Sequence, residues 1–169
     1  MRTPLETSQG PTRRQLLIAG ACALLAIAAG WPLLRRLAAM GPELPPTAPD
    51  FTDAGALEGY SVGRTAEVRL NLPGLSGEAR PLVYVRRKTA DDFQVLSSVC
   101  PHRACTVGFL VQQNMYRCPC HNSWFGQHGD YGGGPAPRNM DPLPWRIRNG
   151  RLFIRWQLFR PDIPQRIVV

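Results

Sequence analysis

Two short turns bring cysteine and histidine together, and they restrict the fold of this chain more than any other feature. The first is a Cys-x-His turn at Cys100 and His102, and the second is a Cys-x-x-His turn at Cys118 and His121. Each turn places a thiolate and an imidazole within reach of one metal site. Residues 103–117 suffice for a hairpin that brings the two turns face to face. We therefore predict a two-loop metal site with these four side chains as its ligands.

The type of metal site is open on the ligands alone. A tetrahedral zinc site takes the same two thiolates and two imidazoles, and the cysteines of this region also allow disulfides. The pattern resembles most the Rieske family, in which one iron of a two-iron two-sulfur cluster has two cysteine ligands and the other has two histidine ligands. On that resemblance, each loop supplies one ligand to each iron.

Two further cysteines, Cys105 and Cys120, lie beside the ligands. The sequences CPHRAC and CPCHNS resemble the Rieske subunit of cytochrome bc-type quinol-oxidising complexes, where a disulfide clamps the two cluster loops. The resemblance implies a disulfide between Cys105 and Cys120, and therefore an oxidising compartment outside the cytoplasm. Two free buried thiols are the alternative. Cys22 is the odd cysteine, and we expect an inert side chain that faces lipid.

A proline-containing segment follows the second turn. Gly134, Pro135, Ala136 and Pro137 resemble the loop that covers the cluster in bc-type Rieske proteins, although Gly-Pro and Ala-Pro alone indicate only a turn. The resemblance implies a loop that shields the cluster sulfurs from water, which influences the potential of the cluster.

Three positions near the cluster bear on the potential and on the class of Rieske protein. Ser123 and Phe125 stand where quinol-oxidising relatives commonly carry Ser and Tyr, whose hydroxyls donate hydrogen bonds to the cluster and a ligand sulfur. Ser123 keeps its donor and joins the cofactor-binding residues, whereas Phe125 has none. We expect a potential below that of a Ser-plus-Tyr relative and above that of a plant-type ferredoxin. Arg103 stands where quinol-oxidising relatives usually carry an apolar residue. The sequence CPHR also begins many Rieske sites of oxygenases, so this position favours the alternative class.

The first 36 residues carry an expected export signal and membrane anchor. Arg13 and Arg14 belong to a pattern that resembles a twin-arginine signal, and an apolar run covers 16–34. At about 1.5 Å per residue this run spans roughly 28 Å as a helix, close to the hydrocarbon thickness of a membrane. We expect a cytoplasmic segment over 1–15 and a retained transmembrane helix over 16–36, with a cleaved signal as the alternative.

Prolines dominate the segment after the anchor. Four of them fall between positions 41 and 50, and they favour an extended spacer. We expect a tether over 37–59 that allows the cluster domain to move, and a plain linker is the alternative.

Residues 60–169 have the pattern of an all-β Rieske-like domain, with small stacked antiparallel sheets and cluster-binding loops, on the single N-terminal helix. Short segments rich in β-branched and aromatic residues alternate with turn residues. The pair Asn149-Gly150 predicts a two-residue hairpin. The expected strands cover 66–72, 82–87, 93–99, 109–111, 116–118, 145–148 and 152–159.

The resemblance implies the electron-transfer subunit of a bacterial bc-type quinol:cytochrome c oxidoreductase, in a respiratory or photosynthetic chain. The implied partners are quinol, a cytochrome b-type membrane subunit and a c-type cytochrome, with the cluster domain on the periplasmic side of the inner membrane. His102 and His121 would contact quinol and couple proton transfer to electron transfer.

Two alternatives from other classes stay open: a Rieske small subunit of a molybdenum oxidase such as arsenite oxidase, and a ferredoxin-like Rieske carrier. Nucleic acid is not an expected partner, because the net charge of +8 accompanies no recognition motif.

Overall fold

The computed structural model describes residues 45–169 of the chain. This range contains ten strands, two short 3-10 helices at Leu57–Gly59 and Gly77–Ala79, and no α-helix. None of its helices is long and apolar enough to cross a membrane. The twin-arginine pattern, the apolar run over 16–34 and Cys22 lie outside the described residues.

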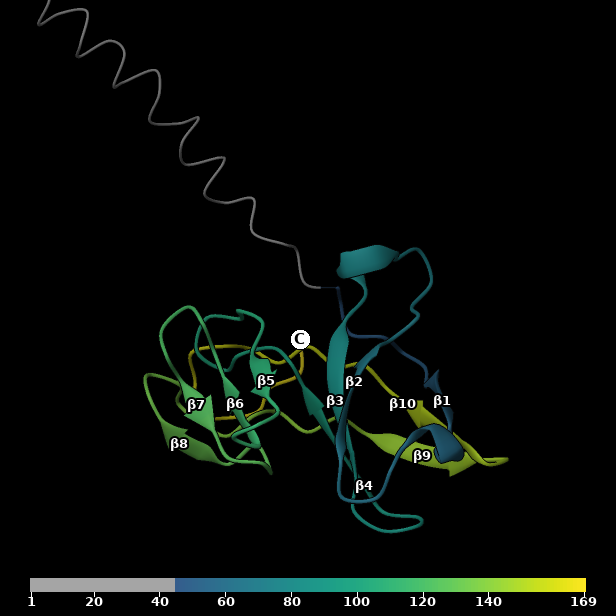
Figure 1. Ribbon diagram of the computed structural model, residues 1–169. Coiled ribbons are helices and arrows are strands. Elements are labelled where there is room, and N and C mark those ends of the chain that lie inside the picture. The colour runs from purple at the N-terminus through teal and green to yellow at the C-terminus, as the bar shows by residue number, and fades with distance from the viewer. Residues whose placement is uncertain (1–44) are drawn as a thin grey trace, which may run out of the picture. The chain divides into compact units, whose positions relative to one another are not determined.

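Three small antiparallel sheets make up the domain (Figure 1). Their strand orders are β1-β10-β9, β2-β3-β4 and β5-β6-β7-β8. The strands are β1 Thr52–Ala56, β2 Thr65–Arg69, β3 Leu82–Arg87, β4 Phe93–Ser97, β5 Gly108–Leu110, β6 Met115–Arg117, β7 Trp124–Phe125, β8 Tyr131–Gly133, β9 Trp145–Arg148 and β10 Arg151–Ile154. We call residues 45–97 and 143–158, which hold the first two sheets, the base, and residues 100–142, which hold the third, the cluster lobe.

Strand β3 joins the two parts because its side chains alternate between two apolar cores. Val83 and Val85 are fully buried in the core of the base, whereas Tyr84 belongs to the core of the cluster lobe. The Tyr84 hydroxyl donates a hydrogen bond of 2.6 Å to the carbonyl of Val107, in the cluster lobe. Leu96 of β4 also packs in this second core. The sheet β2-β3-β4 therefore supports the cluster lobe from one side, as Figure 1 shows.

The hairpin of β9 and β10 confirms the prediction made from Asn149 and Gly150. Both residues have positive φ, 50° and 68°, which a two-residue type I′ turn requires. Strand β9 has the expected bounds. Its residues Trp145 and Ile147 pack against the core of the base, while Arg146 and Arg148, which alternate with them, are exposed.

The start of the folded domain differs from the expectation, since residues 45–59 were assigned to the tether. Strand β1 pairs with β10 in the sheet. Ahead of it, the amide of Ala48 donates to the carbonyl of Trp156 at 3.1 Å, and the Trp156 indole donates to the carbonyl of Pro45 at 3.1 Å. The sequence Thr-Asp-Ala-Gly-Ala has low strand propensity, so only its distant partner β10 makes β1 a strand.

Candidate metal centre

Both predicted ligand loops have the same backbone construction. In the first loop, Cys100 N donates to the carbonyl of Cys105 at 2.8 Å and Ala104 N donates to the carbonyl of Cys100 at 2.9 Å. In the second, Cys118 N donates to Ser123 at 2.8 Å and Asn122 N donates to Cys118 at 3.1 Å. The cysteine therefore begins each loop with the same pair of hydrogen bonds.

The fourth residue after each of these cysteines has a left-handed backbone. Ala104 has φ of 56° and Asn122 has φ of 58°. Asn adopts this conformation readily, while Ala does so only where the surrounding structure holds it. The two loops are thus close copies, one following β4 and the other following β6.

The two loops bring the predicted ligands together in two pairs, the thiols of Cys100 and Cys118 and the imidazoles of His102 and His121. Cys100 and Cys118 are each 1% exposed and carry free thiols. His102 is half-buried and His121 is exposed. The centroids of the two imidazole rings lie 4.8 Å apart, with their planes at 84°.

Burial raises the pKa of the Cys100 thiol to about 11; the neighbouring Cys118 thiol adds to this rise, and the backbone N–H groups of His102 and Arg103 oppose it. A buried thiol without a positive charge nearby keeps its proton. A metal ion supplies that charge, because coordination removes the proton from the thiol. Two buried thiols and two adjacent imidazoles therefore fit a cluster with mixed cysteine and histidine ligands.

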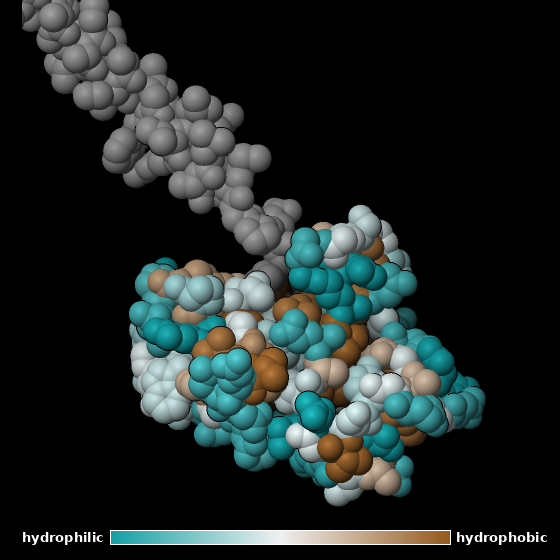
Figure 2. Space-filling view, in the orientation of Figure 1, coloured by the Kyte–Doolittle hydropathy of each residue, from teal (hydrophilic) through white to brown (hydrophobic). Residues whose placement is uncertain are grey.

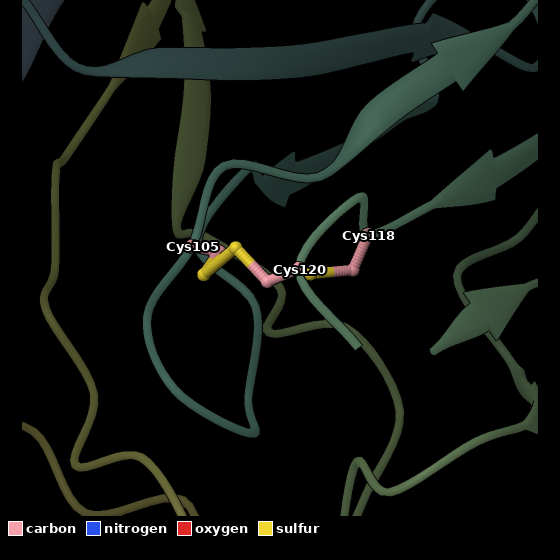
Figure 3. Close-up of side chains that lie close together, drawn as sticks. All are labelled: Cys105, Cys118 and Cys120. Carbon is pink, nitrogen blue, oxygen red and sulfur yellow. A yellow bond between two sulfur atoms is a disulfide. The ribbon is translucent and has the colours of Figure 1, made fainter. Parts of the chain in front are cut away.

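A disulfide joins the two loops through Cys105 and Cys120, as the resemblance implied. The sulfur of Cys118 lies within 4.8 Å of both bridged sulfurs (Figure 3). These three sulfurs do not form a three-thiolate metal site, because two of them are bonded to each other. Among the described cysteines, only Cys100 and Cys118 can act as thiolate ligands.

The segment Gly134–Pro137 packs against the second loop, next to the predicted ligands. Gly134 has φ of 93°, and a Cβ atom at this position would lie 2.6 Å from the Ser123 Cα atom. The amide of Ala136 donates to the Ser123 hydroxyl oxygen at 3.1 Å. Ala136 is buried, Pro135 is exposed and Pro137 is half-buried. A glycine is needed at position 134 for both the backbone conformation and the close approach.

Ser123 and Phe125 occupy buried positions beside the loops, and each is 0% exposed. The Ser123 oxygen accepts from Ala136, so the hydroxyl hydrogen is left to donate elsewhere. Phe125 packs in the same apolar core as Cys100 and Cys118. A tyrosine at this position would therefore add a hydroxyl to the core that holds the two thiols.

A buried ion pair directly follows residues 134–137. The Arg138 guanidinium donates through Nε and Nη2 to the two carboxylate oxygens of Asp141, at 2.8 and 2.7 Å. Its Nη1 atom donates to the carbonyl of Ile163. Arg166 adds a second contact to Asp141, 3.3 Å between Nε and Oδ1. Through the contacts with Ile163 and Arg166, this pair links residues 138–141 to the segment that follows β10, and no pattern in the sequence predicts it.

The segment after β10 also contacts the first ligand loop, which the sequence analysis did not anticipate. The amide of Asp162 donates to the carbonyl of Pro101 at 2.8 Å. The carboxylate of Asp162 lies 3.8 Å from the exposed Arg103 guanidinium. A Pro-Asp pair at 161–162 was the only local signal, and it indicates a turn without its location. His128, the third histidine of the chain, is exposed, and its spacing from the cysteines fits neither ligand turn.

The imidazoles do not line the cleft between the base and the cluster lobe. This cleft has a volume of about 530 Å³ and is lined by residues that include Tyr84, Leu110, Arg117 and Pro119. Figure 2 shows an apolar area over β5 and β6, next to a largely polar surface. An exposed imidazole outside a cleft suits contact with the surface of another molecule more than enclosure of a small substrate.

Comparison with known proteins agrees with this arrangement. The sequence pattern of the Rieske [2Fe-2S] domain matches residues 59–146. A cytochrome b6-f complex iron-sulfur subunit of Nostoc sp. is 30% identical over 105 residues, which cover 62% of this chain and 56% of that protein. The corresponding subunit of Desmonostoc sp. is 29% identical over 85 residues, 50% of this chain and 47% of that protein.

Among solved structures, the plasma-membrane Rieske protein of the cyanobacterium Synechocystis is similar, with 19% identity and a TM-score of 0.46, over 62% of this chain and 98% of that chain. The chain spans about half the length of the curated relatives described above. The match over residues 59–146 shows that this chain belongs to the Rieske [2Fe-2S] domain family and that its cofactor is a Rieske-type [2Fe-2S] cluster.

Proposed function

We propose that this chain is the membrane-anchored electron-transfer subunit of a bc-type complex, which takes an electron from quinol and passes it to a c-type cytochrome. The observation that supports this most is the pair of matching loops. Their two imidazoles lie side by side, 4.8 Å apart between ring centroids, and the Cys105–Cys120 disulfide joins the two loops.

In this proposal Cys100 and Cys118 would hold one iron, and His102 and His121 would hold the other. The cluster supplies one-electron redox chemistry at a potential that its two neutral ligands raise above that of an all-cysteine cluster. The Ser123 hydroxyl would donate a hydrogen bond to the cluster or to a ligand sulfur, and residues 134–137 would shield the cluster from water.

The exposure of His121 gives quinol access to a ligand ring. A histidine that binds metal through one nitrogen keeps the other for a hydrogen bond. That free nitrogen accepts the proton of a quinol hydroxyl, which is how His102 or His121 would couple proton uptake to electron uptake.

Membership of a bc-type complex rests on two supports. The Cys105–Cys120 bridge is the feature by which the sequence resembles quinol-oxidising complexes more than oxygenase carriers. The relatives from Nostoc and Desmonostoc carry the name of a cytochrome b6-f complex subunit. The proposed partners are a cytochrome b-type membrane subunit and a c-type cytochrome, with residues 16–36 as the anchor and the cluster domain outside the cytoplasm.

Purification of the tagged full chain from its native membranes tests this function. We expect a b-type haem in the same detergent-solubilised complex. We also expect quinol to reduce the cluster, which EPR detects. His121→Ala removes a ligand and should abolish the signal, whereas His128→Ala changes an exposed histidine outside the site and should leave the reduction intact. A large molybdenum subunit in place of the b-type haem would contradict the proposal.

A further inference from the structure

The free thiol of Cys118 lies beside a bond with which it can react. Its sulfur and the two sulfurs of the Cys105–Cys120 bridge all lie within 4.8 Å of one another, and Figure 3 shows the Cys118 side chain next to that of Cys120. Cys100, the other free cysteine of the described range, is not part of this group.

The backbone holds Cys118 in this place without the cluster. Its amide and its carbonyl both take part in hydrogen bonds within the loop, to Ser123 and from Asn122. Pro119 follows it and restricts the rotation of the chain toward Cys120. The thiol is therefore kept near the bridge, and such proximity makes an intramolecular reaction much faster than a reaction between separate molecules.

We propose that, in chains without the cluster, Cys118 undergoes thiol–disulfide exchange with the Cys105–Cys120 bridge. The Cys118 thiol gives up its proton to the alkaline solvent, and the resulting thiolate forms a bond to one bridged sulfur. The existing sulfur–sulfur bond breaks, and the other sulfur leaves as a thiolate that takes up a proton from the solvent. Within the cluster lobe, one disulfide and two thiols are present before and after the exchange, so no oxidant or reductant is consumed. The inference rests on the proposed assignment of Cys118 as a cluster ligand.

The exchange has a consequence for the assembly of the centre. A Cys118 sulfur bound to iron is not available for attack, so the cluster preserves the Cys105–Cys120 bridge. A chain whose bridge forms before the cluster arrives loses a ligand to the wrong disulfide. The cluster must therefore enter first and the bridge must form afterwards, or the bridge must be reduced again before the cluster can bind.

Disulfide mapping of the full chain tests the exchange. The chain carries Cys22→Ser, so that only the four cysteines of the cluster lobe remain, and EPR first verifies the cluster. Half of the sample is stripped anaerobically with EDTA at mildly alkaline pH, and the other half is incubated with its cluster. Both are alkylated with N-ethylmaleimide at intervals over minutes to hours, the range of uncatalysed disulfide rearrangement, then digested and mapped by mass spectrometry.

The expected result is a change of partner with no change in the number of free thiols. The stripped chain should acquire a bridge that contains Cys118, with Cys105 or Cys120 newly alkylated and Cys100 still free. The sample that keeps its cluster should show only the Cys105–Cys120 bridge. An unchanged bridge in the stripped chain, or a bridge that contains Cys100 in place of Cys118, would overturn the proposal.

A second preparation excludes an effect of the sulfide that leaves the cluster. The His102→Ala, His121→Ala chain lacks both imidazole ligands and needs no stripping, and it should also contain the Cys118 bridge. A Cys118 bridge that forms only after chelation would assign the reaction to released sulfide and overturn the inference. Absence of the Rieske signal before stripping would contradict the ligand assignment instead, so the two failures are distinguishable.

Discussion

The base and the cluster lobe are built from the same kind of short antiparallel strand, yet different interactions hold them together. The core of the base consists of aliphatic and aromatic side chains such as Val83, Leu152, Ile154 and Trp156. The core of the cluster lobe includes two free cysteines, and its strands have only two or three residues. The base can therefore form by apolar burial alone, whereas the lobe also depends on its bridge, its loop hydrogen bonds and its cluster.

The largest effect should come from the core of the base. Ile154→Ala removes a fully buried side chain and should lower the free energy of unfolding by about 2–5 kcal/mol. A thermal melt followed by far-UV circular dichroism measures this, while the EPR spectrum of the folded protein should stay unchanged. Ile167→Ala, at an exposed isoleucine, is the control and should change stability by about 0.5 kcal/mol or less. An altered EPR spectrum without a lower melting temperature would contradict the division of the domain.

Removal of the bridge should act on the lobe alone. Cys105→Ser with Cys120→Ser opens a loop with a sequence separation of 15 residues, which corresponds to about 3 kcal/mol. We expect the cluster to be lost at a temperature at which the far-UV signal of the base persists. The visible absorbance of the cluster monitors this loss. Simultaneous loss of both signals at the wild-type temperature would show that the bridge does not stabilise the lobe.

A smaller effect is expected in the covering loop. Gly134→Ala combines a positive φ with a contact of 2.6 Å to the Ser123 Cα atom, and we expect a cost of about 1–3 kcal/mol with a shifted cluster potential. Gly74→Ala is a matched control, because Gly74 has a positive φ of 78° in open space. It should cost stability without a change in potential. Equal potentials for both variants and wild type would mean that residues 134–137 do not influence the cluster.

The smallest structural change is Phe125→Tyr, which adds one hydroxyl to the core of the lobe. A hydrogen bond from this hydroxyl to a ligand sulfur stabilises the reduced cluster, so the potential should rise. Phe109→Tyr places the same group at a half-buried position of the lobe and should leave the potential near that of the wild type. A redox titration of both variants measures this, and no rise for Phe125→Tyr would mean that the ring does not point at a sulfur.

The contrast between the two parts also explains what the sequence could predict. Strand β9 has the expected bounds because its apolar and basic residues alternate with a period of two. Strand β3 has them because its run of β-branched and aromatic residues is bounded by turn residues. Strand β1 has no such pattern and depends on β10, about 100 residues further along the chain. Strands β7 and β8 are too short to carry a period.

The cluster loops were predictable for another reason, since their cysteines, histidines and glycine have specific chemical or conformational requirements. The Arg138–Asp141 pair and the contact between Asp162 and Pro101 had no such signal. The contacts of this pair with Ile163 and Arg166, like that of Asp162 with Pro101, depend on how the segment after β10 returns to the lobe. Arginine and aspartate are also ordinarily surface residues, so the sequence gives no sign that this pair is buried.

An EPR-monitored redox titration of the full chain in detergent, at neutral and at alkaline pH, tests the central claim most directly. We expect a Rieske signal with a positive potential that falls as the pH rises, because reduction takes up a proton at a ligand imidazole. A pH-independent potential near the lower Rieske limit of about −150 mV, or bound metal without a Rieske signal, would contradict it.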